Sequence, residues 1–497
     1  MSTPKTKRRP RTKKKTTEGK DWVLDVIPDD AFGSTADAPP RPGPEAPALA
    51  IDERFEYLVR NPVVYEVAQA VLPPRPEGSP GRPSGYPPYI YFLFLYAISI
   101  FGSARSTAAH LARSLWWDPV RRAVGEFIDP FEAEELTDAG PTLSQWNYFF
   151  KHYLKDAVAD LRDVSQEAWI QQALDQGVAA KRTRGSWIYP EREQVLHGDA
   201  TVACPPSDHT ETETHDKETG EIRTHRVDPD ASHTTEGGGR KVYGNKFLSF
   251  AVRTANSPHS RIILALESVR HKARKHDPHR EDEGKAAVRI VKKIPGLRAV
   301  TYDTALRGVH RAPLIAEGLV VFTPRHNGLE PHPLQKYEDK DSPCNGHNLY
   351  VAAGRICERH ITVDGETHYA PLPVEELECR HAAATRFYHR LEIPCNRGNH
   401  YLRIRVDETK EDREIDPSTK KARFNRTEHL RQIPPDTPAG RRLKGFRQDS
   451  ESQHSRFDQS YPHKRVPAYG AHAALLIYIG FAWVSNSIAR AFGRQKP

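Results

Sequence analysis

The sequence contains little sulfur, with five cysteines and one methionine in 497 residues. So few cysteines exclude the small secreted domains that depend on a dense set of disulfides. The N-terminal stretch carries no apolar segment of the kind that marks a secretory signal peptide. Together these two features predict a cytosolic protein whose cysteines are reduced.

Long apolar runs are also lacking. The two longest candidates are Tyr89–Phe101, with 13 residues, and Ala471–Val484, with 14. A helix that spans a bilayer needs about 20 apolar residues. We therefore expect both runs to form buried core helices and predict no association with a membrane.

Positive charge is in mild excess, at +8, but it is concentrated in one place. Lys5–Lys20 carries nine Lys or Arg against one Glu. Such a block is typical of a disordered arm that contacts phosphates, and a solubilising tail has the same composition. Residues 1–50 as a whole are basic and then rich in Pro and Ala, which predicts a disordered tail and linker.

Helical patterns occupy residues 51–185. Apolar residues recur at helical spacing after Thr142, which we expect to be an N-cap. Short helices that carry arginines are compatible with a DNA-binding domain of helix-turn-helix type and equally with simply packed helices. The arginines in question are Arg105, Arg113, Arg121 and Arg122.

From residue 186 to 325 the pattern changes to strands and then to alternating helix and strand, which predicts a mixed α/β sheet. Asp199 falls in the first expected strand, "QVLHGDATVA". Asp303, in "VTYDTALRG", ends the strand that follows the first expected helix. If these two strands are neighbours, the two carboxylates face each other. Taken alone, Asp303 is better explained as the N-cap of a helix that begins at Thr304.

These motifs resemble those of the DDE transposases of bacterial insertion sequences. The resemblance rests on "GDATV", on "TYDTALRG", and on the late "RQDSESQHSRF", which is followed by an apolar helix with Asn486. The family signature is Tyr, two residues, Arg, three residues, Glu, six residues, Lys. Arg447 and Glu451 keep the Arg-to-Glu step, whereas Lys444 and Asp458 replace the Tyr and the Lys. Asp449 competes with Glu451 as the third acid.

The resemblance implies an RNase H-like sheet in residues 186–325 and 440–497, with an inserted β-rich subdomain at 326–439. It implies that Asp199, Asp303 and Glu451 bind Mg²⁺ or Mn²⁺, since hard oxygen ligands suit these ions and paired cations promote in-line phosphoryl displacement. It also implies a homo-oligomer assembled on DNA. We assign DNA contacts to Arg447, to Lys464 and Arg465 in place of the missing lysine, and to Arg240, Lys241 and Lys246. The glycines beside that last group, Gly237–Gly239, also fit a plain flexible loop.

Four cysteines fall in the expected insertion, each with a histidine nearby. The pairs are Cys344 with His347, Cys357 with His360, Cys379 with His381 and Cys395 with His400. Close Cys–His pairs can chelate structural Zn²⁺, but these spacings match no standard finger. We expect reduced core cysteines more than a zinc site.

The sequence therefore predicts a metal-dependent DNA transposase located in the cytoplasm at the nucleoid. Two rivals share the fold, namely an inactive transposase-derived DNA-binding protein and an RNase H-like nuclease.

Overall fold

The computed structural model of the chain describes residues 22–33, 48–73, 85–178, 186–215, 219–235, 239–270, 280–326, 328–338, 344 and 346–494. Every structural statement below refers to these residues. The basic arm predicted at Lys5–Lys20 lies outside them, as do Gly237 and Gly238. The roles assigned to both segments stay predictions.

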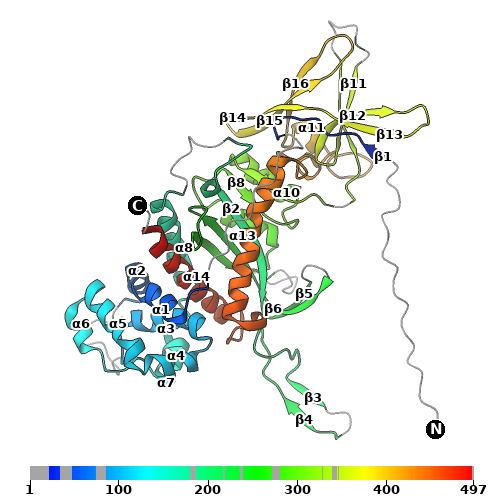
Figure 1. The fold of residues 1–497 in the computed structure, drawn as a ribbon. Coiled ribbons are helices and arrows are strands. Elements are labelled where there is room, and N and C mark those ends of the chain that lie inside the picture. Colours follow the sequence, from blue (N-terminus) through cyan, green and yellow to red (C-terminus); the bar gives the residue numbers. More distant parts are fainter. Residues whose placement is uncertain are drawn as a thin grey trace.

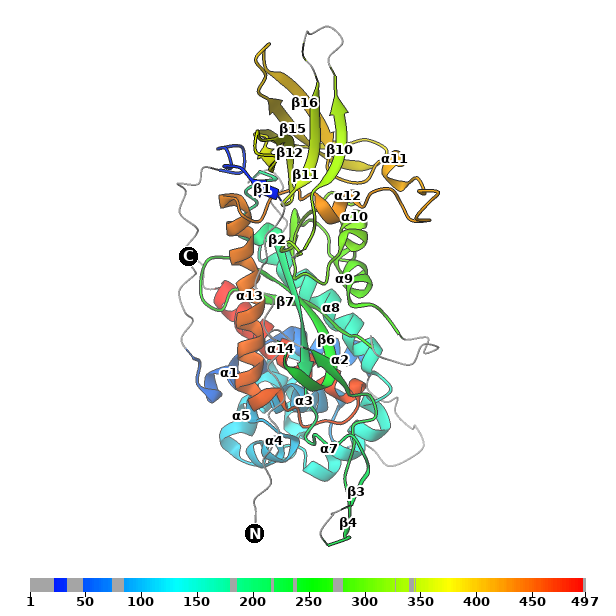
Figure 2. The ribbon, with the colours of Figure 1, turned by 90° about the vertical axis from the view of Figure 1, so that its right-hand side faces the viewer.

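A helical part stands at one end of the molecule (Figures 1 and 2). Its central helix, α3, is buried at every position from Tyr89 to Ile100. Thr142 caps α7 as predicted, since its hydroxyl accepts from the Gln145 backbone N–H. The helices are α1 (Ile51–Val59), α2 (Pro62–Val71), α3 (Pro88–Phe101), α4 (Ala104–Leu111), α5 (Ser114–Phe127), α6 (Pro130–Glu135), α7 (Leu143–Phe149), a π-turn (Phe150–Leu154) and α8 (Val158–Asp175).

The last helix of the chain, α14 (Ala471–Arg494), completes this helical core by packing on α1, α3 and α8. Its segment Ala471–Gly493 is long and apolar enough to cross a membrane, as are α3 and α4 together, although those two meet at a bend of 110°. However, 83% of the apolar window of α14 is buried inside the protein. Both apolar runs therefore form core helices, and the second helix extends well beyond the run that predicted it.

A mixed sheet lies next to the helical part. Its strands run in the order β7–β6–β2–β8–β9, and β5 pairs with the other half of the long strand β6. β2 is antiparallel to β6 and parallel to β8, which is parallel to β9. The elements are β2 (Val195–Ala203), a hairpin of β3 (Glu213–His215) and β4 (Ile222–Thr224), β5 (Ser232–Thr235), β6 (Lys241–Arg253), β7 (Arg261–Ser268), α9 (Glu283–Val291), β8 (Ala299–Thr301), α10 (Gly308–Ala316) and β9 (Val320–Phe322).

The two faces of this sheet pack against different helices, since side chains alternate between the faces along each strand. Leu196, Leu248 and Val300 point to the face that packs with the apolar side of α9 and α10. His197 and Asp199, on the other face, contact residues of α13 (Pro438–Ser460). The predicted α/β class is confirmed. On the face of Asp199, α13 covers β2, and α14 and α8 cover β7 next to the apolar residues Phe247, Ala251 and Ile263.

Between β9 and α13 the chain forms a β-rich insertion, drawn at the top of Figure 2. One sheet has the order β1–β13–β12–β11–β10, and a second has the order β14–β15–β16. The elements are β10 (His332–Tyr337), β11 (His347–Ala352), β12 (Arg355–Ile361), β13 (Thr367–Pro371), β14 (Val374–His381), β15 (Thr385–Ile393), β16 (His400–Arg405), α11 (Lys410–Arg413) and α12 (Arg426–His429).

The predicted disordered tail of residues 1–50 is wrong for residues 22–33. β1 (Trp22–Leu24) adds to the insertion as a parallel partner of β13. Phe32 is fully buried, and Asp30 forms an ion pair with the buried Arg355 at 3.4 Å. The average composition of residues 1–50 did not reveal this short apolar stretch, which is buried only because it packs on the distant insertion.

Asn486 joins α14 to the sheet. Its side-chain oxygen accepts from the Ile263 backbone N–H at 2.8 Å, and its side-chain nitrogen donates to the Ile263 carbonyl at 2.8 Å. The amide thus supplies both hydrogen bonds that a neighbouring strand would supply to β7. Asn486 is fully buried, so water cannot replace these bonds.

We expect Asn486→Leu to lower the free energy of unfolding by about 2–4 kcal/mol, because it leaves a buried N–H and a buried carbonyl unpaired. Denaturant unfolding measures this loss. The matched control is Gln171→Leu, since Gln171 is exposed and its amide donates only across the surface of α8 to Asp175. Equal stability of the Asn486→Leu variant and the wild type would refute the strand-like role of this amide.

Candidate active site

Parallel pairing of β2 with β8 brings Asp199 and Asp303 together. The last paired residues are His197 and Thr301. Asp199 lies two residues further along β2, and Asp303 lies two residues beyond the end of β8. The side chain of Asp303 accepts from the Ala305 N–H at 2.8 Å in a turn. The predicted helix at Thr304 is absent from the described chain, since α10 begins at Gly308. Asp303 is therefore not a helix N-cap, and the expected side-by-side strands are present.

The glycine before Asp199 allows this arrangement. A Cβ on Gly198 would lie 2.3 Å from the ring of Phe250, which lies against the β2 backbone. The Phe250 ring in turn stacks on Tyr302, with ring centroids 5.7 Å apart. Tyr302 directly precedes Asp303, so this apolar contact on the far face holds the two acid-bearing strands in position.

The two carboxylates disfavour each other's ionisation. Burial first, and then the charge of Asp303, raises the pKa of Asp199 to about 6. Burial also raises the pKa of Asp303. A pair of largely buried acids with raised pKa values is typical of a functional site, because it destabilises the fold unless cations are bound.

α13 supplies the third predicted acid from above. Arg447 has one guanidinium nitrogen 3.9 Å from Asp199 and another 3.8 Å from Glu451. His454 has its Nδ1 3.9 Å from Asp199. Arg447, Glu451 and His454 thus share one flank of the helix, although Glu451 remains 61% exposed. Sequence reasoning missed His454, whose only sequence signal is its position two helical turns after Arg447.

A further acid, Glu283, also lies near the pair. It is the first residue of α9, accepts from the Tyr302 hydroxyl at 2.9 Å and is paired with Lys246. Its charge contributes to the raised pKa values of Asp199 and Asp303. Sequence reasoning missed Glu283, since an acid in a first helical turn is common for reasons of helix stability.

The other cations assigned to DNA lie at different distances from the acids. Lys246 is largely buried in its pair with Glu283. Arg465 is paired with Asp208 just beyond the end of β2, where the Lys464 carbonyl accepts from Cys204. Lys241 begins β6, eight residues from Ser249, the partner of Asp199; this is about 27 Å along a strand. Arg240 precedes it and is exposed. Their contacts with DNA stay predictions.

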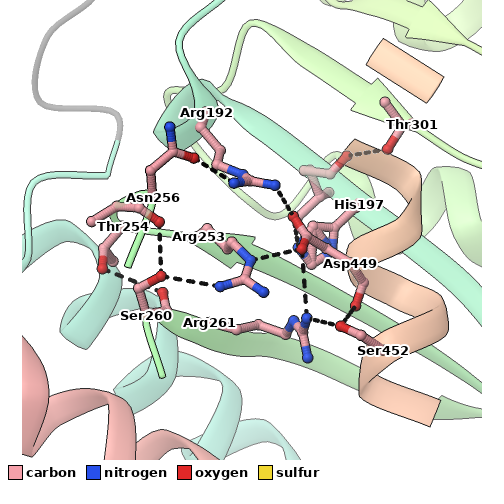
Figure 3. A network of polar contacts seen from close by, with 12 residues as sticks. Arg192, His197, Arg253, Thr254, Asn256, Ser260, Arg261, Thr301, Asp449 and Ser452 are labelled. Carbon is pink, nitrogen blue, oxygen red and sulfur yellow. Dashed lines mark hydrogen bonds and ion pairs between the residues drawn. The ribbon is translucent and has the colours of Figure 1, made fainter. Parts of the chain in front are cut away.

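Asp449, the competing third acid, points away from the aspartate pair. It lies two residues from both Arg447 and Glu451, which places it about 200° around the helix from either. There it is held by three arginines (Figure 3): Arg253 at 2.7 Å, Arg192 at 3.1 Å and Arg261 at 3.6 Å. On geometry, Glu451 is the better candidate for the third acid.

The charge of Asp449 stabilises this cluster. Burial alone would raise the pKa of the carboxyl, but the charged groups around it hold the pKa below its usual range. Burial lowers the pKa of the adjacent His197 to about 3, so this imidazole is neutral at neutral pH. The guanidinium groups therefore supply the compensating charge, and Asp449 anchors α13 to β6 and β7.

The insertion brings together two of its four Cys–His pairs. The ligand atoms of Cys344, His347, Cys395 and His400 all lie within 4.8 Å of one another. Cys357 is a buried core residue, as expected of the cysteines in general. The expectation of core cysteines is wrong for Cys344 and Cys395, which are only partly buried.

Comparisons with known proteins add little to this geometry. No protein-family model and no curated protein matches the chain. Neither search assigns it to the insertion-sequence family that its motifs resemble. A cryo-EM structure of a piggyBac transposase synaptic complex with hairpin DNA is similar over 91% of this chain and 78% of that one, at 12% identity and a TM-score of 0.33. So distant a likeness carries no inference about chemistry.

We expect Asp199→Asn to stabilise the metal-free protein above pH 6. The pKa of this carboxyl is near 4 in the unfolded chain and about 6 in the folded protein. As the pH rises from about 4 to beyond about 6, the carboxyl therefore destabilises the fold. The gain at pH 8 in EDTA should approach about 3 kcal/mol at 1.36 kcal/mol per pKa unit and vanish at low pH. In the same unfolding measurement, added Mg²⁺ should stabilise the wild type more than the variant. A variant less stable than the wild type at pH 8 in EDTA would contradict the repulsion.

Asp449→Asn, on the opposite flank of α13, should have the reverse effect. Removing one partner leaves the buried Arg261 and the half-buried Arg192 and Arg253 without their counter-charge, which costs about 3–5 kcal/mol at neutral pH. Because the folded-state pKa is depressed, this stabilisation is complete above the unfolded pKa near 4 and is lost as pH falls through the folded value. Unfolding curves of Asp199→Asn and Asp449→Asn at several pH values show whether the first variant is more stable and the second less stable than the wild type. An unchanged stability at pH 7 would show that Asp449 is dispensable.

Proposed function

We propose that this protein is a DNA transposase that cleaves at transposon ends and joins them to target DNA by two-metal phosphoryl transfer. The observation that carries the proposal is the juxtaposition of Asp199 and Asp303 on adjacent parallel strands, with the Glu451 side of α13 above them. The resemblance of the surrounding motifs to DDE transposases supports the assignment of DNA as substrate.

The donor set fits hard divalent cations. Asp199 and Asp303 offer carboxylate oxygens, the ligands that Mg²⁺ and Mn²⁺ prefer. Their mutual repulsion is relieved by added positive charge. Glu451 is the third donor in this proposal. When bound, paired cations activate the attacking oxygen and stabilise the leaving one.

The chain's own residues prepare the site for that chemistry. Backbone N–H groups of Ala200 and Ala305 each donate to one aspartate oxygen, which orients both carboxylates. Arg447 lies between Asp199 and Glu451 and balances their charge in the metal-free state. In our proposal this guanidinium moves to a DNA phosphate when cations replace it at the carboxylates.

The proposal includes the partners that the family implies. DNA ends and target DNA are the substrates, and a homo-oligomer holds two ends at once. Arg240, Lys241, Lys464 and Arg465 are proposed to contact flanking phosphates, and the protein is proposed to act in the cytoplasm at the nucleoid. Each of these points is a prediction.

We expect Asp199→Asn, Asp303→Asn and Glu451→Gln each to reduce cleavage to background while the protein stays folded. Asp303→Asn is the sharpest of the three, because Asn can still accept from Ala305 and preserves the turn. The assay incubates the full chain with Mg²⁺ or Mn²⁺ and a supercoiled plasmid that carries the DNA flanking the gene on both sides. Gels then resolve nicked, cut and joined products.

The matched control is Glu411→Gln, which neutralises an exposed acid far along the chain from the site. It should cleave like the wild type. Retained cleavage by Asp303→Asn would refute the metal-binding assignment. Cleavage without joined products would favour the nuclease alternative, and DNA binding without cleavage by the wild type would favour the inactive DNA-binding alternative.

A further inference from the structure

Two loops at the outer end of the insertion meet at a cluster of sulfur and nitrogen atoms. Cys344 lies just before β11 and His347 is the first residue of that strand, whereas Cys395 lies between β15 and β16 and His400 is the first residue of β16. β11 and β16 belong to different sheets, and both begin at the end of the insertion remote from α13 (Figures 1 and 2). One ligand atom from each residue lies within 4.8 Å of the other three.

The distances inside the cluster match those around a tetrahedral zinc ion. The two sulfur atoms are 3.7 Å apart, and two thiolates bound tetrahedrally at about 2.3 Å from zinc are about 3.8 Å apart. This separation far exceeds the roughly 2.05 Å of a disulfide. His347 Nε2 lies 3.2 Å from the Cys344 sulfur, close to the roughly 3.5 Å edge of a Zn–S, Zn–N tetrahedron.

Glu358 on β12 orients one of the imidazoles. Its carboxylate lies 2.7 Å from His347 Nδ1. A carboxylate accepts hydrogen bonds, so Nδ1 carries the proton and the lone pair of Nε2 points toward Cys344. A histidine ligand whose other nitrogen donates to a carboxylate is the usual arrangement around protein-bound zinc. Glu358 is held in place by cross-strand pairing with Leu349.

We propose that Cys344, His347, Cys395 and His400 bind one structural Zn²⁺ that joins the start of β11 to the start of β16. Two sulfur and two nitrogen ligands close a tetrahedral site, so no position remains for substrate and the role is structural. The ion connects two sheets that share no strand pairing among the described residues. This proposal is independent of the proposed function.

The same chain offers a matched control for the zinc ligands. Cys379 also lies near a histidine, with its sulfur 3.8 Å from His381 Nε2, but among the described residues no second Cys–His pair joins it in a four-ligand group. Zinc affinity should therefore depend on Cys344 and His400 and not on Cys379. A single Cys–His pair supplies two of the four ligands that a structural site needs.

The test measures the metal content of the full-length protein after expression with zinc and dialysis against metal-free buffer, by inductively coupled plasma mass spectrometry. We expect one zinc per chain in the wild type and in Cys379→Ser, and strong loss in Cys344→Ser and His400→Ala. A wild type without zinc, or Cys344→Ser and His400→Ala variants that both retain it, would overturn the site.

Two measurements keep the test decisive if the ligand variants do not fold. Wild-type protein loaded with Co²⁺ should show thiolate-to-cobalt charge-transfer absorption, which disappears when Zn²⁺ is added in excess. Mass spectrometry of protein purified without reductant should find Cys344 and Cys395 as free thiols. Absence of the charge-transfer band, or a disulfide between these two cysteines, would refute the proposal.

Discussion

The parallel contact between β2 and β8 is the constraint on which the candidate site depends. It places Asp199 beside Asp303 with both carboxyls largely buried, an arrangement that burial and like charge both oppose. Apolar packing on the other face of the sheet offsets that penalty. The ring of Phe250 fills the space left by Gly198 and stacks on Tyr302, so the acid pair stands on a rigid apolar support.

The two flanks of α13 face opposite charges: one faces the aspartate pair and the other faces a cluster of arginines. One flank presents Arg447 and His454 to the aspartate pair and leaves Glu451 exposed. The other flank buries Asp449 among arginines that fix the helix on β6 and β7. The buried cluster anchors the helix, and the first flank faces the aspartate pair of the sheet, whose repulsion lowers stability. Such a loss of stability is typical of functional sites.

Local patterns predicted the central sheet because its signals are short-ranged. The alternation in "NKFLSFAVRTA" and the β-rich run before Asp303 each identify a strand without knowledge of its neighbours. The raised pKa of Asp199 was beyond sequence reasoning, since it depends on a residue more than a hundred positions away. His454 was missed for the same reason, since its contact with Asp199 joins residues far apart in the chain. Glu283 was missed because acids are common in the first turn of a helix. Among the cysteines, spacing within each Cys–His pair gave no way to choose which two pairs meet, because that choice is made by the contact between two turns.

The segment at residues 22–33 connects the insertion to the candidate site through α13. β1 extends the sheet that contains β12, and Asp30 pairs with Arg355 at the start of that strand. Arg355 also pairs with Asp436, just before α13, and the Phe32 carbonyl accepts from Ala439 in its first turn. These contacts fix the first turn of α13 against the insertion. Because an α-helix transmits position along its axis, the place of Arg447 and Glu451 over Asp199 depends on this junction as well as on the Asp449 anchor. The insertion is therefore one of the two supports of α13, the helix that carries Arg447 and Glu451.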